Sequence, residues 1–336
     1  MKYLITGITG FAGPNLANLL VKKGHEVCGL VRASNGREND IRDIVPDKVY
    51  NKISFLYGDL TDSDSINRVF KATKFDGVFH LAAQSHPPTS FFDPKGTYRT
   101  NVEGTRNIAE ALKNYQRDCA LMFCSTSEVY GVVSESNGAI KEDQLIRPIN
   151  PYGASKAISD VEILADANIK AEPFNMPFFV TRAFSHTGLR RGKNFSISSD
   201  AYQIARIKKG FQEKVINVGT LSSKRAVMDV RDCVEAYYNL MGLAVERDRR
   251  VIGEAFNVGG DEVYTMGELL DKMLCLAGLE GQVEKKIDEK FVRKIDIPVQ
   301  IPDSAKLKEL TDWKPKISMD TTLADLLGYW YKKISE

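Results

Sequence analysis

The chain has 336 residues, 43% hydrophobic and 27% charged, which is the composition of an ordinary soluble globular protein. Its 46 basic residues nearly balance 44 acidic ones, so no broad field attracts nucleic acid, and no apolar run is long enough for a membrane span. Because five cysteines and four histidines show no ligand spacing, we expect a metal-free cytoplasmic protein with reduced thiols.

The first half of the chain alternates short apolar strands with amphipathic helices. This alternation predicts right-handed βαβ crossovers, and therefore a Rossmann-type doubly wound parallel sheet in an α/β protein. The predicted strands are 2–7, 25–32, 53–60, 76–83 and 119–127, and the predicted helices are 15–24, 64–73 and 101–115.

After about residue 185 the pattern loosens into loops rich in Gly, Ser, Lys and Arg. Helices are predicted again at 229–245, 265–278 and within 313–333. We expect a dinucleotide-binding domain over 1–184 and a smaller α/β substrate-binding lobe over 185–336, with some segments of the second half returning to the first domain.

Three glycines stand where the first strand meets the first helix, in the segment "GITGFAG". Glycine permits the tight turn there and the close approach of a pyrophosphate, while the helix N-terminus offers free N–H groups to the anion. The alternative is an ordinary turn, but the position between strand and helix favours dinucleotide binding. The predicted cofactor contacts in this loop are Gly7, Thr9, Gly10, Phe11 and Gly13.

The end of the second strand bears on the choice of cofactor. NAD sites carry an acid there, whereas Val31 occupies that position in this chain and Arg32 follows it. The missing acid favours NADP, with NAD as the alternative and a plain surface arginine as the simplest explanation of Arg32. Further cofactor contacts are expected from Asp59 and Leu60 after the third strand and from Leu81, Ala82 and Ala83 at the end of the fourth.

The segment "NPYGASK" places Tyr152 and Lys156 four residues apart, which puts both side chains on one face of a helix. A lysine beside a phenol favours the phenolate, so the tyrosine can act as an acid and a base. This spacing arises by chance in many helices. It gains weight from the glycine loop upstream and from Thr126 at the end of an intervening strand.

The motifs TGxxGxxG, "HLAAQS", "NVEGT", "STSEVYG", "PYGASK" and "TRAFSHTG" occur in this order along the chain. The whole chain thereby resembles the extended short-chain dehydrogenase/reductases, which act on nucleotide sugars. The resemblance implies that Thr126 binds the hydroxyl at carbon 4 of the sugar, that Tyr152 takes its proton, and that Lys156 holds the nicotinamide ribose. Asn101 would shape the active-site helix.

Glu128 distinguishes the reaction within this family. The sequence Thr126-Ser127-Glu128 is similar to that of GDP-mannose 4,6-dehydratases, in which oxidation at carbon 4 acidifies the hydrogen at carbon 5. One carboxyl group can remove that proton and then help expel the hydroxyl at carbon 6, before carbon 6 is reduced. The alternative is that Glu128 caps a loop or pairs with a cation.

The resemblance also implies a GDP-sugar site in the second half, with Arg225 clamping the diphosphate and Arg190, Arg191 and Lys193 near phosphates. Solvated loop residues are the alternative for these last three. Ser185 and Ala226 depart from the family pattern, which leaves open whether the hexose is GDP-mannose or a GDP-N-acetylhexosamine. The remaining predicted substrate contacts are Ser85, His86, Ser127 and Ser185.

Three other functions compete with the dehydratase. A GDP-4-keto-6-deoxymannose reductase fits the segment from Trp313 to Trp330 well, but commonly has Ser at the position of Thr126. A 4-epimerase has no use for Glu128. A protein that binds NADP without turnover has no physical reason to keep Thr126, Tyr152 and Lys156. The resemblance further implies a homodimer or homotetramer built on the helices that carry Asn101 and Tyr152.

Overall fold

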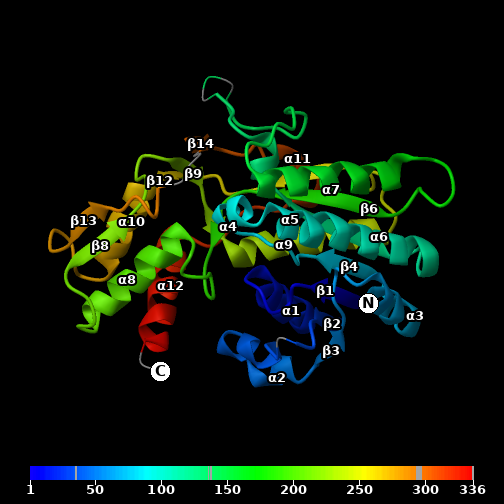
Figure 1. The fold of residues 1–336 in the computed structure, drawn as a ribbon, viewed down its shortest axis with the longest axis horizontal. Helices are drawn as coiled ribbons and strands as arrows, with labels where there is room; N and C mark the ends of the chain where they lie inside the picture. The colour runs from blue at the N-terminus through cyan, green and yellow to red at the C-terminus, as the bar shows by residue number, and fades with distance from the viewer. Residues whose placement is uncertain (35, 135, 137, 293–296, 335–336) are drawn as a thin grey trace.

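The computed structural model describes residues 1–34, 36–134, 136, 138–292 and 297–334. Seven parallel strands form the central sheet in the order β11-β6-β5-β4-β1-β2-β3, which confirms the predicted doubly wound fold (Figure 1). The strands are β1 (Lys2–Thr6), β2 (Glu26–Val31), β3 (Ile53–Tyr57), β4 (Gly77–His80), β5 (Ala120–Thr126), β6 (Phe178–Ala183) and β11 (Ala255–Val258).

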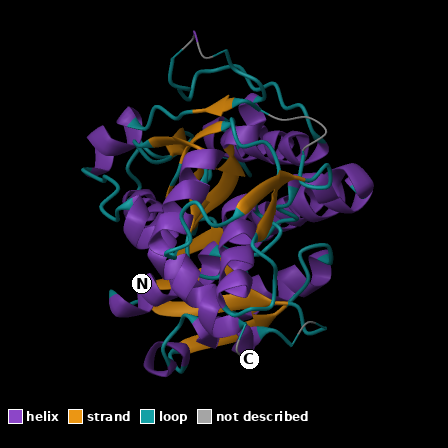
Figure 2. Cartoon of the chain, turned by 90° about the vertical axis from the view of Figure 1, so that its left-hand side faces the viewer, coloured by secondary structure: helices purple, strands orange, loops and turns teal. Residues whose placement is uncertain are grey.

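Helices cover both faces of this sheet (Figure 2). Successive strand residues point to opposite faces, so Tyr3 and Ile5 join one buried apolar layer and Leu4 joins the other. The first layer is closed by α1 (Ala12–Lys22) and α9 (Val230–Val245), and the second by α3 (Ser63–Ala72), α6 (Gly104–Tyr115) and α7 (Pro151–Asn168).

A smaller lobe stands beside the sheet domain and has its own apolar core (Figure 1). One of its helices, α8, was not predicted, although Ile197, Ala201, Ile204 and Ile207 repeat at helical spacing and are all buried. The lobe comprises α8 (Ser196–Lys208), β8 (Val215–Val218), β9 (Lys224–Ala226), β12 (Val263–Thr265), α10 (Met266–Leu276), β13 (Glu284–Ile287), β14 (Val299–Gln300) and α12 (Met319–Lys333).

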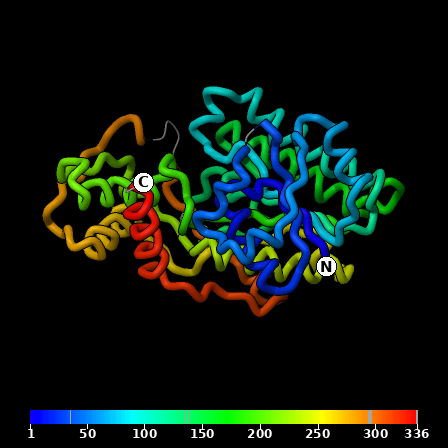
Figure 3. Tube along the Cα trace, turned by 90° about the horizontal axis from the view of Figure 1, so that it is seen from below, coloured from blue at the N-terminus to red at the C-terminus, as the bar shows by residue number. Residues whose placement is uncertain are grey.

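Segments of the second half also build the sheet domain. Strand β11 pairs with β6, and α9 packs against α1, while the chain that carries α11 (Ala305–Thr311) runs back beneath the sheet domain before it enters α12 (Figure 3). Among the described residues, no helix combines the length and the apolar character that crossing a membrane requires.

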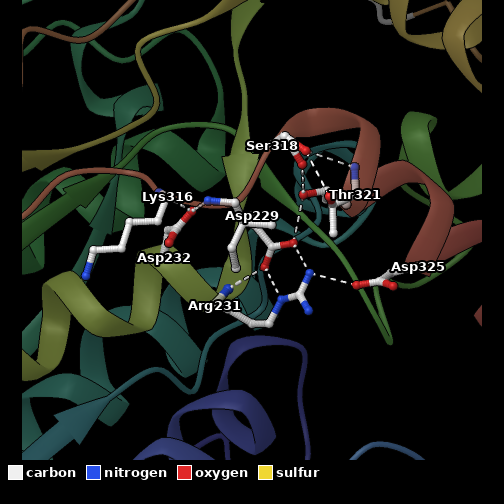
Figure 4. A network of polar contacts seen from close by, with 9 residues as sticks. Asp229, Arg231, Asp232, Lys316, Ser318, Thr321 and Asp325 are labelled. Carbon is white, nitrogen blue, oxygen red and sulfur yellow. Dashed lines mark hydrogen bonds and ion pairs between the residues drawn. The ribbon is translucent and has the colours of Figure 1, made fainter.

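A buried carboxylate joins the two parts of the molecule (Figure 4). Asp229 is fully buried at the start of α9, where it caps the helix and accepts hydrogen bonds from Arg231 and from the Thr322 hydroxyl of α12. The Arg231 guanidinium also contacts Asp325 of α12, at 2.8 Å. Because both charges of the central pair are satisfied, this network fixes α12 of the small lobe against the sheet domain.

The segment "SHPPTSFFDP" after β4 is largely helical. Its prolines begin two short helices, Pro87 in α4 (Pro87–Phe92) and Pro94 in α5 (Pro94–Tyr98). Proline suits the first turn of a helix because its missing N–H would have no partner there. The α5 segment continues through η2 (Arg99–Glu103) into α6.

Candidate active site

The glycine-rich loop lies at the point where the strand order reverses, between β1 and β4. Gly7 has φ +74°, and a Cβ there would lie 2.8 Å from the Ala82 backbone nitrogen. A side chain at Gly13 would likewise collide with the Gly7 carbonyl. Without side chains at these positions the backbone at the start of α1 is compact, a geometry that fits the close approach of a dinucleotide pyrophosphate.

The segments after β2 and β3 carry the residues predicted to contact the adenosine half of the cofactor. Arg32 is exposed directly after β2, beyond the buried Val31. Asp59 is partly buried, and its carboxylate accepts hydrogen bonds from the Thr61 backbone and hydroxyl, both at 2.9 Å. Leu60 is buried against Gly104 of α6. No acid stands at the end of β2, where NAD sites carry one, and Arg32 takes the next position.

Replacing Arg32 with Ala is expected to weaken NADP binding about tenfold or more while leaving NAD binding nearly unchanged, because only NADP carries the 2′-phosphate that a guanidinium can bind. Fluorescence titration of the purified variant with NADPH and with NADH measures both dissociation constants. An equal loss for the two cofactors would reject a role of Arg32 at the phosphate.

Asn101 connects the cofactor side to the catalytic helix. Its side chain accepts from the Gln84 N–H at 2.8 Å and donates to the Gln84 carbonyl and to the Ser155 hydroxyl, at 3.0 and 2.9 Å. The amide is thus fully occupied in joining the loop after β4 to α7. Leu81, Ala82 and Ala83, the predicted cofactor contacts at this position, are partly buried in the same loop.

Tyr152 lies in the first turn of α7, buried beside the end of β5. Its phenol hydrogen-bonds the Thr126 hydroxyl. Burial raises the pKa of Tyr152, whereas Thr126 and the positive charge of Arg191 lower it. The structure thus places Tyr152 beside Thr126, and Arg191 is a cation near the phenol that the motif did not indicate.

Lys156 lies one turn further along α7, 3% exposed, with its Nζ 4.1 Å from the centre of the Phe123 ring. Among the described residues it has no carboxylate or hydrogen-bond partner. Burial lowers its pKa to about 8, although Cys124 and Asp160 act in the opposite direction. An unpaired buried ammonium group of this kind is available to a ligand hydroxyl such as that of a ribose.

The low pKa of Lys156 predicts a dependence of stability on pH. The unfolded chain holds the proton up to the ordinary lysine value of 10.5, so above pH 8 it binds more protons than the folded protein. Relative to a Lys156→Met variant, the free energy of unfolding of the wild type should rise by about 2 kcal/mol from pH 8 to pH 10. Urea denaturation of both proteins at the two pH values measures this difference, and a constant difference would contradict the assigned pKa.

Glu128 follows β5 in the short helix η3 (Ser127–Tyr130) and is 8% exposed. Its carboxylate Oε2 accepts a hydrogen bond of 2.8 Å from Asn150 Nδ2. Asn150 is also the N-cap of α7, since its Oδ1 accepts from the Gly153 N–H at 2.7 Å. One asparagine therefore sets both the start of the catalytic helix and the position of the carboxylate, and the charge of Glu128 is felt at Tyr152.

Asn150 and Ser90 were not among the predicted site residues. The Ser90 hydroxyl accepts from the Tyr152 N–H at 3.1 Å and so supports the first turn of α7 from α4. The signal for Asn150 was present in the sequence, because an asparagine directly before a proline is typical of a helix N-cap. The signal for Ser90 was absent, since its partner is 62 residues away.

The two neighbouring arginines of the loop after β7 (His186–Thr187) have different surroundings. Arg190 donates to the Thr9 and Gly10 carbonyls, at 2.8 and 3.0 Å, and pairs with Asp43. Arg191 stacks on the Phe195 and Phe11 rings, 3.5 and 4.7 Å from their centres, and has no carboxylate partner among the described residues. Burial lowers its pKa to about 10. Arg191 is thus the arginine available to an anion.

The remaining predicted substrate residues differ in their burial and in their contacts. His86 contacts the edge of the Phe195 ring, with centroids 5.5 Å apart. Arg225 is buried on β9, where it donates to the Lys224 carbonyl at 2.8 Å. The others are the exposed Ser85 and Lys193, the partly buried Ser185 and the buried Ser127.

Comparisons with known proteins agree with this geometry. A sequence model of the family described as GDP-mannose 4,6 dehydratase matches residues 4–326. GDP-6-deoxy-D-mannose reductase of Pseudomonas aeruginosa is 28% identical over 100% of this chain and 99% of its own length. GDP-mannose 4,6 dehydratase 1 of Arabidopsis thaliana is 31% identical over 94% of this chain and 86% of its own length.

Solved structures share the fold across nearly the whole chain. A structure of RMD from Pseudomonas aeruginosa complexed with NADPH superposes with a TM-score of 0.82 at 28% identity, covering 99% of both chains. A UDP-glucose 4-epimerase from Thermotoga maritima reaches the same TM-score at 24% identity, over 99% of this chain and 100% of its own, and shows likeness of fold alone. The family model matches nearly the whole chain, and the glycine-rich loop and the residues Thr126, Tyr152 and Lys156 agree with it. The chain therefore belongs to the GDP-mannose 4,6 dehydratase family of extended short-chain dehydrogenase/reductases.

Proposed function

We propose that this protein is an NADP-dependent 4,6-dehydratase that removes water from a GDP-hexose and gives the 4-keto-6-deoxy sugar. The observation that carries the proposal is Glu128, a buried carboxylate that Asn150 holds beside the Thr126–Tyr152 pair. Transfer of a proton at carbon 4 requires only the tyrosine. A carboxyl group at this position is the additional acid and base that elimination between carbons 5 and 6 requires.

Three side chains would assist the oxidation of the sugar at carbon 4. Thr126 orients the sugar hydroxyl, Tyr152 accepts its proton, and Lys156 binds the cofactor ribose and favours the phenolate. NADP, when bound, supplies the transient oxidation at carbon 4 and the later reduction at carbon 6. The glycine-rich loop would hold its diphosphate, and Arg32 would bind its 2′-phosphate.

Glu128 would then carry one proton through the elimination. Its carboxylate removes the hydrogen at carbon 5, which the neighbouring ketone has made acidic. The same group, now protonated, donates to the departing hydroxyl at carbon 6, and one water molecule leaves. Glu128 ends the elimination as a carboxylate. When carbon 6 is reduced, carbon 5 takes up one proton, which balances the proton that Tyr152 removed from the hydroxyl at carbon 4, so overall the sugar loses only water.

The sugar nucleotide is proposed to bind between residues 1–184, which hold the cofactor, and the lobe within 185–336. Arg191 has no carboxylate partner among the described residues. Its planar guanidinium suits the paired oxygens of a diphosphate. Arg225 supplies a second guanidinium on β9. GDP-mannose and a GDP-N-acetylhexosamine both fit this chemistry, and relatives named for GDP-mannose favour the first.

The test is a change of mass. Purified protein is incubated with GDP-mannose, and separately with GDP-N-acetylglucosamine, without any added reductant. Loss of about 18 mass units from one of them, as expected for elimination of water, supports the dehydratase and identifies the sugar. Unchanged substrates in both incubations would contradict it.

A GDP-4-keto-6-deoxymannose reductase is the second candidate, because the reductase of Pseudomonas aeruginosa matches this chain from end to end. A reductase consumes one NADPH for each product and needs the same Tyr152 and Lys156, but no carboxyl group for carbon 5. NADPH consumption on a 4-keto-6-deoxy GDP-sugar, together with no loss of water from GDP-mannose, would establish this alternative instead.

We also propose that the protein assembles through α6 and α7 into a homodimer or homotetramer. Ile158 and Val161 on α7 are 39% and 55% exposed, an apolar surface that a second copy would cover. Helix α7 also carries Tyr152 and Ser155, whose hydroxyl accepts from Asn101, so such an interface would stiffen the catalytic helix.

A further inference from the structure

Arg190 ties together two parts of the cofactor domain that are distant in sequence. From the loop after β7, its guanidinium donates to the Thr9 and Gly10 carbonyls of the glycine-rich loop, at 2.8 and 3.0 Å. The same group donates to the Asp40 carbonyl and, at 2.8 Å, to the Asp43 carboxylate. Arg190 has φ +71°, an uncommon conformation for this residue type, which this set of contacts holds in place.

Asp43 extends this connection to the C-terminal helix. It ends η1 (Glu38–Asp43), and one of its carboxylate oxygens accepts from Arg190 while the other accepts from the Tyr329 hydroxyl of α12, at 2.9 Å. Lys333 Nζ lies 4.0 Å from the same carboxylate. The side chains of Arg190 and Asp43 are 9% and 13% exposed, so this ion pair is largely shielded from water.

The contacts of Arg190 and Asp43 connect two segments that would flank the adenosine half of the cofactor. The glycine-rich loop continues β1, and the segment that ends at Asp43 continues the neighbouring strand β2. In a dinucleotide-binding sheet the adenosine half of the cofactor lies between these two segments. Arg190 joins these two segments, and Asp43 attaches them to α12.

We infer that Asp43, Arg190 and Tyr329 form a clasp that closes over the adenosine half of the cofactor and slows its release. This inference rests on the proposed NADP site. A resident cofactor suits the proposed reaction, because the sugar loses only water and the cofactor ends each cycle in its starting oxidation state. The clasp would act by positioning the glycine-rich loop, without contact to the reacting atoms.

The test is the rate of cofactor release. Asp43→Asn removes the charge that holds Arg190, and the dissociation rate of NADPH should rise about tenfold, the effect of losing one charge-assisted hydrogen bond. Release is followed by NADPH fluorescence in a stopped-flow displacement with excess NADP. Tyr329→Phe removes the hydroxyl that binds Asp43 and leaves Lys333 in place, so it should give a smaller increase without disturbing the fold.

Asp47→Asn is the matched control. It removes the same charge from the same segment, but Asp47 pairs with Arg42 on the surface and has no contact with Arg190 or α12. Its dissociation rate should equal that of the wild type. Simple electrostatics predicts the opposite sign for Asp43→Asn, because removing a negative charge near an anionic cofactor should slow its release.

Each result separates the clasp from the cofactor assignment. Wild-type protein that fails to bind NADPH would overturn the proposed cofactor. Wild-type protein that binds NADPH, with an unchanged or slower release from Asp43→Asn, would overturn the clasp alone. An unchanged rate in Tyr329→Phe would remove Tyr329 from it.

Discussion

Replacing Tyr152 with Phe is expected to lower kcat by about three orders of magnitude, the range lost when a positioned acid–base group is removed. In the proposed reaction the phenol beside Thr126 accepts the proton, and phenylalanine fills nearly the same buried volume without an ionisable group. Because Asn150 caps α7 and Ser90 binds the backbone N–H of residue 152, the helix should keep its position. Steady-state kinetics and a cofactor titration of the same preparation check both statements.

Tyr3→Phe is the control for losing a buried phenol. Tyr3 is fully buried on β1, where its hydroxyl donates only to the Met1 sulfur, at the strand end opposite to the glycine-rich loop. Its kcat should be that of the wild type. Turnover by Tyr152→Phe at the rate of this control would show that another group takes the proton.

Replacing Glu128 with Gln is expected to stop dehydration while allowing the first half of the reaction. Glutamine can still accept from Asn150 Nδ2 through its carbonyl oxygen, so the geometry is retained, but it cannot take the proton from carbon 5. Water loss should slow by about a hundredfold to ten thousandfold. Bound cofactor should accumulate in its reduced form, visible as absorbance of the reduced nicotinamide after substrate is added.

Glu142→Gln is the matched control for this substitution. Glu142 is another partly buried carboxylate that accepts an N–H, from Asn257 at 2.8 Å, and burial raises its pKa. It lies outside the Thr126–Tyr152 group. Dehydration at the wild-type rate by both variants would make Glu128 a structural residue and would show that another group takes the proton from carbon 5.

The sheet and its cofactor end could be predicted because their causes are local in sequence. Alternating strands and helices dictate the parallel sheet, and glycines at 7 and 13 are required by backbone collisions that any side chain would create. Helix α8 was missed because its first turn is rich in serine, which disfavours a helical prediction although its isoleucines repeat at helical spacing.

The site was harder to predict where long-range contacts decide a role. Arg190 and Arg191 are neighbours with the same chemistry, and only the fold shows that Asp43, 147 residues away, pairs with the first and leaves the second to an anion. The cations around Tyr152 show the same limit. Arg191 reaches the phenol from another segment, which the four-residue spacing within α7 could not indicate.

The most direct test of the proposed reaction follows one hydrogen atom. The GDP-hexose that loses water is prepared with deuterium at carbon 4 and incubated with the protein and its bound cofactor alone, and the product is examined by NMR. A redox-neutral dehydratase predicts that the deuterium is found on carbon 6 of the 4-keto-6-deoxy product. A 4-keto-6-deoxy product without deuterium at carbon 6, or a product formed only with added NADPH, would contradict it.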